Sequence, residues 1–168
     1  MAEKEEITKE KVKYSGLGDF KAAYSHAHGF LEDKNYDIVE DKYTEKSKGD
    51  SKNVEIEWTA SRKIEDYFKI ELKVKWKIES LTDVEVEIDG KKKQMNNIGT
   101  LEIEIKGTLV TDHSGKWKTT AFQKFLKETY HRFIIPNKLE TRKKETTKIV
   151  QDFKEEMKAF FELTGRRK

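Results

Sequence analysis

The feature that most constrains the fold is a long, strict alternation of apolar and charged residues. In FKIELKVKWKIES, residues 68–80, the apolar side chains fall on even positions, and Lys or Glu occupies nearly every odd one. A period of two places the apolar side chains on one face of a β-strand and the charged ones on the other. Such a strand spans roughly 40 Å. Its sheet therefore needs a cover of similar length on one side only.

The same alternation recurs along the first two thirds of the chain and predicts further strands around residues 7–14, 36–45, 54–60, 84–88 and 101–109. Asp89-Gly90 is a hairpin signal, because both residues tolerate the positive φ angles of a tight turn. The lysines of 68–80 are predicted to lie between the Glu55/Glu57 strand and a second acidic strand, since opposite charges attract across strands. That second strand carries either Glu85/Glu87 or Glu102/Glu104, and the sequence leaves both open.

Helical spacing appears in two places. After a predicted cap at Asp19, apolar residues recur three and four positions apart until about Lys34-Asn35. From Lys118 the period is helical again, with a break expected at Pro136. A final helix of about 27 residues, roughly 40 Å long, is predicted to follow, with Gly165 at its end. Its apolar stripe consists of Thr146, Ile149, Val150, Phe153, Met157, Phe160 and Phe161.

These elements predict a single α+β domain over residues 1–168, with residues 1–5 frayed and residues 116–168 forming a helical C-terminal part. The fold is an antiparallel sheet of about five or six strands. One face is covered by helices, including the long C-terminal helix, which we expect to pack on the 70–76 strand. In element order this arrangement resembles the helix-grip architecture of lipid- and hormone-binding proteins. That resemblance implies a pocket between the sheet and the final helix.

Composition excludes several classes of chemistry. The absence of cysteine rules out disulfides, zinc–thiolate sites and cysteine nucleophiles. The charged N-terminus is unlike a signal peptide, and no apolar run reaches the roughly 18 residues of a membrane span, so we expect a cytoplasmic protein. Asp112, His113 and Ser114 include the residue types of a hydrolase triad, but adjacent residues cannot form the relay geometry. His26 and His28 lie two apart on a helix, which prevents both from binding one metal. We expect no enzymatic activity, metal or cofactor.

Large apolar side chains on the predicted core faces form the first candidate site. Aromatic residues of a curved sheet and its covering helices can line a cavity for a small apolar ligand, although ordinary core packing is the alternative. The candidate pocket residues are Tyr24, His28, Trp58, Trp76, Phe153 and Met157.

Charge asymmetry indicates a second candidate site. Residues 1–115 carry a net charge of −5 and residues 116–168 carry +8. A basic half can bind a polyanion such as nucleic acid or an anionic membrane, although a solvated helix surface has the same composition. The candidate basic surface consists of Lys124, Lys127, Arg132, Lys144, Lys148, Lys154 and Lys158.

Three functions are consistent with this sequence. We rank first a non-enzymatic interaction or structural module with a protein partner, which would use either the free sheet face or the basic helices. A carrier or sensor for a small apolar ligand comes second. An electrostatic binder of nucleic acid or anionic membrane comes third, because the scarcity of arginine weakens base-specific recognition.

Overall fold

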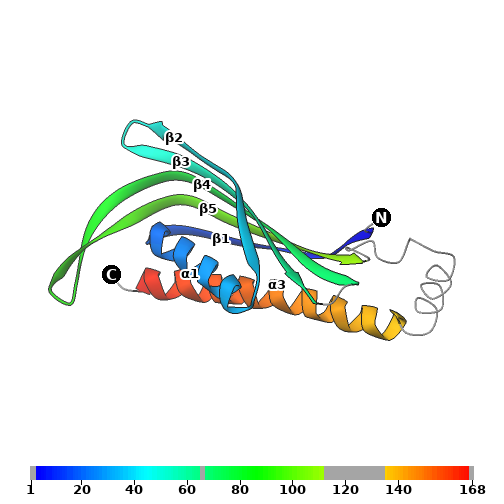
Figure 1. The fold of residues 1–168 in the computed structure, drawn as a ribbon. Coiled ribbons are helices and arrows are strands. Elements are labelled where there is room, and N and C mark those ends of the chain that lie inside the picture. The colour runs from blue at the N-terminus through cyan, green and yellow to red at the C-terminus, as the bar shows by residue number, and fades with distance from the viewer. Residues whose placement is uncertain (1–2, 65–66, 112–134, 167–168) are drawn as a thin grey trace.

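The computed structural model describes residues 3–64, 67–111 and 135–166, which form a five-stranded antiparallel sheet with helices on one side (Figure 1). The strand order is β1-β5-β4-β3-β2. The predicted α+β class is confirmed, and so is the long C-terminal helix. The helix predicted from Lys118 lies outside the described residues. The elements are β1 (Glu3–Gly18), α1 (Phe20–Asp33), β2 (Asp37–Lys48), β3 (Ser51–Lys63), β4 (Phe68–Ile88), β5 (Lys91–Thr111) and α3 (Ile135–Arg166).

Two predicted boundaries are wrong. The expected fraying of residues 1–5 does not hold for residues 3–5, because β1 already pairs with β5 from Glu3. Residues 68–80 and 84–88 are one strand, since β4 bends at Ser80 instead of ending there. Ser80 has a φ of 56°, and its N–H donates to the Asn53 side chain at 3.1 Å. Gly99 lies opposite, where a Cβ would approach the Ser80 Cβ to 2.7 Å, so only glycine fits this bend.

The hairpin between β4 and β5 turns at Asp89-Gly90, as predicted, with φ angles of 52° and 76°. The β4 lysines lie between β3 and β5, so the second acidic strand is the one that carries Glu102 and Glu104. Glu85 and Glu87 belong to β4 itself, beyond its bend. There they lie opposite Gln94 and Lys92 of β5.

The two helices divide the apolar face of the sheet between them. α3 lies mainly over β1 and β5. Aromatic rings of α1 lie over β3 and β4, where Tyr24 contacts Trp58 and both Phe20 and Tyr24 contact Trp76. Our expectation that the final helix packs on residues 70–76 is therefore wrong in its main contact, because α1 occupies that space. Phe153 and Met157 of α3 are fully buried, as their place in the apolar stripe predicted.

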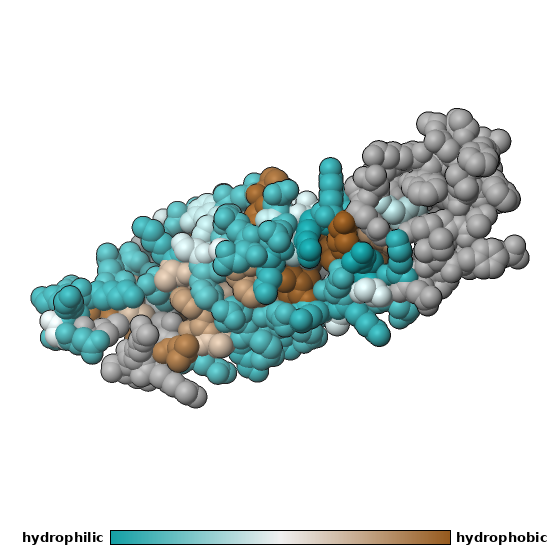
Figure 2. All heavy atoms as spheres, turned by 60° about the horizontal axis from the view of Figure 1, so that its bottom comes forward, coloured by the Kyte–Doolittle hydropathy of each residue, from teal (hydrophilic) through white to brown (hydrophobic). Residues whose placement is uncertain are grey.

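α3 also closes one edge of the sheet. Its Lys143 and Lys154 form ion pairs with Glu5 and Glu10 of β1, at 3.3 Å and 3.1 Å. Hydrogen bonds from Lys154 and from Gln151 lower the pKa of Glu10. The surface on the helix side is mostly hydrophilic, with apolar atoms visible only in small separate areas (Figure 2). None of the described helices is long and apolar enough to cross a membrane.

Candidate functional site

The helix-free face of the sheet carries rows of charged side chains that run across the strands in register. One row alternates in sign from edge to edge, and we call it the alternating row. Neighbouring strands in this row therefore attract one another. Its members, in the order β1, β5, β4, β3 and β2, are Lys11, Glu104, Lys75, Glu57 and Lys42.

The next row breaks this rule. Lys9 of β1, Lys106 of β5 and Lys73 of β4 are direct cross-strand neighbours, and we call these three residues the basic row. Like charges placed opposite each other in a sheet are destabilising. Lys9 reaches Glu104 at 3.5 Å. Within the described part of the chain, neither Lys73 nor Lys106 forms an ion pair, so these two adjacent cations have no carboxylate in direct contact.

A shallow hollow of about 410 Å³ lies over the basic row. Side chains of both rows line it, together with Glu6 and Asp41 at opposite edges of the sheet. Every strand of the sheet contributes to this lining. The hollow thus offers unpaired positive charge in its middle and mixed charge around its rim.

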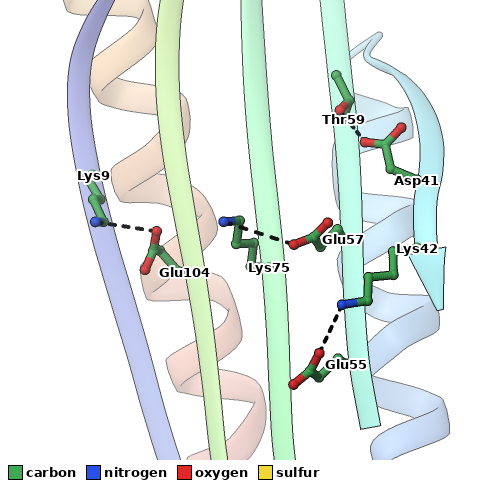
Figure 3. Close-up of polar contacts among 8 residues, drawn as sticks. All are labelled: Lys9, Asp41, Lys42, Glu55, Glu57, Thr59, Lys75 and Glu104. Carbon is green, nitrogen blue, oxygen red and sulfur yellow. Dashed lines mark hydrogen bonds and ion pairs between the residues drawn. The ribbon is translucent and has the colours of Figure 1, made fainter. Parts of the chain in front are cut away.

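Ion pairs hold the surrounding side chains in place (Figure 3). Lys75 lies 4.0 Å from Glu57, and Lys42 donates a hydrogen bond to Glu55 at 3.1 Å. The Lys42 hydrogen bond lowers the pKa of the Glu55 carboxyl, and the same contact raises the pKa of Lys42. The Thr59 hydroxyl donates to Asp41, which occupies a bulge in β2. Side chains around the hollow are therefore held by ion pairs and hydrogen bonds, whereas Lys73 and Lys106 of the basic row have no ion pair within the described chain.

The structure divides the predicted apolar pocket residues into two groups. Tyr24, His28, Trp58 and Trp76 form one aromatic cluster between α1 and the sheet, with ring centroids 5.0 to 6.4 Å apart. Phe153 and Met157 lie under α3, where Phe153 contacts Phe30 of α1 at 6.2 Å. Both tryptophans are buried, whereas Tyr24 and His28 are half-buried at the rim.

The aromatic cluster contains a buried indole N–H without an acceptor and a tyrosine hydroxyl with a raised pKa. The indole N–H of Trp76 is buried and has no acceptor among the residues that the structure describes, whereas the indole N–H of Trp58 lies close to the Tyr24 hydroxyl and lowers its pKa. Leaving such a donor unpaired costs about 1–3 kcal/mol. Burial, together with a hydrogen bond donated to Glu40 at 2.6 Å, raises the pKa of Tyr24 to about 12.

The predicted basic surface is placed only in part. Lys124, Lys127 and Arg132 lie outside the described residues. Lys144, Lys148 and Lys158 are exposed on α3, as predicted. Lys154 is instead paired with Glu10 of β1, because it lies on the side of α3 that faces the sheet edge. The exposed side of α3 also carries Glu140, Glu155 and Glu162, so its charge is mixed.

The two histidines of α1 do not form a metal site. His26 contacts Glu156 of α3 at 3.0 Å and stacks on Phe160, whereas His28 pairs with Glu32. Each is half-buried. Across residues 3–64, 67–111 and 135–166, no group of three or more His, Asp or Glu side chains is arranged to hold a metal ion.

Sequence reasoning missed the basic row, although one signal was present. The outward residues of β5 are Glu102, Glu104 and then Lys106, so the sign changes within one strand. Lys9 and Lys73 become its neighbours only through the strand order and register. Strand order and register depend on contacts between residues that are far apart in the sequence.

Comparison with known families identifies the chain at family level only. The model of DUF244, an uncharacterized protein family (ORF7), matches residues 5–112, which include α1 and all five strands except the first two residues of β1. The chain therefore belongs to the DUF244 family. Searches of curated proteins and of solved structures each returned no match.

Proposed function

We propose that this protein is a non-enzymatic interaction module that binds a protein partner through the charged face of its sheet. The observation that carries the proposal is the basic row at the bottom of the 410 Å³ hollow. Lys73 and Lys106 are held side by side without acidic partners in the described chain. A partner carboxylate placed between them relieves their repulsion and forms two charge-assisted contacts.

Mixed charge around the hollow favours a protein over a polyanion. A nucleic acid presents phosphates at regular short intervals, and its affinity comes mainly from neutralising them. Glu6, Glu57 and Glu104 border the basic row and repel such a backbone. A protein segment can instead place an acidic side chain over the lysines and basic side chains over the rim. Complementary charge of this kind gives specificity more than raw affinity.

The test is a selection of binding peptides from a displayed random library, followed by affinity measurements with the soluble chain. We expect the selected peptides to combine a central acidic residue with basic flanks. The double variant Lys73→Glu/Lys106→Glu should weaken their binding at least about tenfold, because two attractive contacts become repulsive.

The matched control reverses two exposed lysines elsewhere. Lys144→Glu/Lys148→Glu on α3 changes the net charge equally and should leave peptide binding within about twofold, since distant sites act independently. Peptides that bind both variants equally well would contradict the proposal. Binding of generic duplex DNA at about 50 mM salt that only the α3 variant abolishes would favour the basic helix surface instead.

A second candidate function has its own supporting observation. The unpaired indole N–H of Trp76 favours a small apolar ligand with an acceptor atom, bound between α1 and the sheet. A saturable change in tryptophan fluorescence on titration with a long-chain fatty acid, together with a rise in melting temperature, would support it. No response to fatty acids, long-chain alcohols or sterols would count against it.

A further inference from the structure

We propose that the open edge of β2 binds an extended segment of a protein partner, which joins the sheet as a sixth strand with acidic outward side chains. This surface adjoins the hollow on the sheet face at Asp41, but its occupant pairs through the backbone of β2. Strand addition of this kind takes its affinity from main-chain hydrogen bonds and its specificity from alternate side chains.

The two edges of the sheet differ in how they are protected. β1 forms one edge, and Lys143 and Lys154 of α3 reach over it to Glu5 and Glu10. β2 forms the other edge and pairs with β3 alone among the described strands. Nearly all of β2 is exposed. An exposed strand edge presents unpaired backbone N–H and C=O groups that can accept another strand.

Apolar side chains on β2 also lack a cover. Val39 is 59% exposed and Tyr43 is 49% exposed, and both are large hydrophobic residues. Tyr43 lies opposite Ile56, which is fully buried, so the apolar surface of the core continues to the rim of the sheet. An added strand with an apolar residue opposite Tyr43 would extend that core by one strand.

The charge of the added strand follows from the alternating row. Lys11, Glu104, Lys75, Glu57 and Lys42 change sign at every step from β1 to β2. The next residue in this series is acidic. Lys46 lies on the same outward side of β2, is exposed and has no ion pair within the described chain. Beyond the bulge at Asp41, the charged residues on the outward side of β2 are thus basic, and a second copy that pairs there would place like charges together.

These features specify the partner segment. Acidic residues lie opposite Lys42 and Lys46, and an apolar residue lies opposite Tyr43. This alternation of acidic and apolar residues is itself a strand pattern. Lysines on an edge strand also discourage pairing between identical sheets. The same residues therefore reject a second copy and select an acidic strand.

The probe is a synthetic peptide of about eight residues in which Glu alternates with Val, Ile or Thr, the usual length of a strand. Its control carries Lys in place of every Glu. The full chain should bind the Glu peptide at least about tenfold more tightly than the Lys peptide, because each cross-strand charge pair changes sign. Binding should slow amide hydrogen exchange in β2 and leave β1 unchanged.

Charge reversal on β2 tests the assignment. Lys46→Glu should weaken binding of the Glu peptide about fivefold, and Lys42→Glu/Lys46→Glu should reverse the preference between the two peptides. Lys42 also contacts Glu55, so its reversal can destabilise the sheet. A destabilised sheet would bind both peptides less well. A reversed preference between the two peptides therefore shows that charge on β2 selects the added strand. The control Lys144→Glu/Lys148→Glu should bind as the wild type does.

The variant Lys73→Glu/Lys106→Glu separates this proposal from the function proposed above. It should leave binding of the Glu peptide within about twofold at physiological salt, because Lys73 and Lys106 lie on β4 and β5 and do not pair with β2, and salt screens exposed charges. Loss of binding in that variant would place the peptide on the sheet face and overturn strand addition at β2. Equal affinity for the two peptides would overturn it as well. So would a concentration-dependent dimer that protects the β2 amides.

Discussion

The two faces of the sheet come from the same strands but differ in what determines their side chains. The helix side is determined by packing: Trp58, Trp76, Ile103 and Phe153 are almost inaccessible to solvent. The charged side is determined by sign, because lysines and glutamates alternate from strand to strand wherever pairing allows. An exception to close packing on one face therefore has a different meaning from an exception to charge alternation on the other. On the packed face an exception would be a defect, whereas on the charged face it is the feature on which we base the proposed binding surface.

The largest expected effect is on the packed face. Phe153→Ala should lower the free energy of unfolding by about 3–5 kcal/mol, as truncation of a buried aromatic residue does. Phe153 lies on α3, contacts Phe30 of α1 and has no exposed area. Chemical denaturation would measure the loss, with Lys144→Ala on the exposed side of α3 as the control. A loss below about 1 kcal/mol would mean that α3 is not the cover of this face.

A smaller loss is expected where α3 approaches the backbone of β5. A Cβ at Gly107 would lie 2.8 Å from side-chain carbons of both Thr146 and Val150. Both side chains are branched and buried, so they cannot swing away. Gly107→Ala should cost about 1–3 kcal/mol, as overpacking does in a close-packed core.

Gly49→Ala is not a suitable control for this change, because Gly49 has a φ of 59° and would add backbone strain. Gly29→Ala on α1 is suitable, since a Cβ there meets no atom within 4 Å. It should be neutral or slightly stabilising, because alanine favours a helix over glycine. If Gly107→Ala is as well tolerated as Gly29→Ala, α3 does not pack as closely on β5 as the structure shows.

On the charged face the sign of the effect is itself the prediction. Lys106→Glu restores alternation in the basic row and should stabilise the fold by roughly 0.2–1 kcal/mol for each new cross-strand pair. Glu104→Lys makes the opposite change one outward position earlier in the same strand. It removes the ion pairs with Lys9 and Lys11 and should destabilise the fold by a similar amount.

The two variants together distinguish stability from function. If Lys106→Glu stabilises the sheet and also abolishes peptide binding, the basic row is kept for binding at the expense of stability. If Lys106→Glu destabilises the sheet, the lysine has a structural partner, and the proposed site loses its main support. Denaturation midpoints at low and at high salt would show whether charge causes either effect, because salt screens exposed pairs.

Much of the fold could be predicted from local patterns, because one-sided strands and amphipathic helices repeat at fixed periods. Asp89-Gly90 and Asp19 were correctly placed for the same reason, since turns and caps depend on a few adjacent residues. The contact of α3 with β1 and β5 was not predictable, because it depends on the space that α1 leaves free. The basic row required the register of three strands. Its residues are 33 to 97 positions apart in the sequence.

The smallest expected effects are pKa changes at two ion pairs, one at the sheet edge that α3 covers and one on the charged face. The pKa of Glu10 is lowered by hydrogen bonds from Lys154 and Gln151, and the pKa of Glu55 is lowered by Lys42. A carboxyl whose pKa is depressed in the folded state stabilises the fold above its unfolded value of 4.5. That contribution is lost as pH falls through the folded pKa. Lys154→Met should therefore raise the Glu10 pKa toward 4.5, and Lys42→Met should do the same for Glu55.

NMR titration of the two carboxyl groups would measure these shifts, and amide hydrogen exchange would show their structural consequence. Lys154 connects α3 to β1, so Lys154→Met should also speed exchange at the β1 edge. Lys42 connects β2 to β3, which are already paired along their length, so Lys42→Met should change exchange less. Equal exchange in both variants would mean that α3 does not protect the β1 edge. The difference between the two edges, on which strand addition at β2 depends, would then be smaller than the structure indicates.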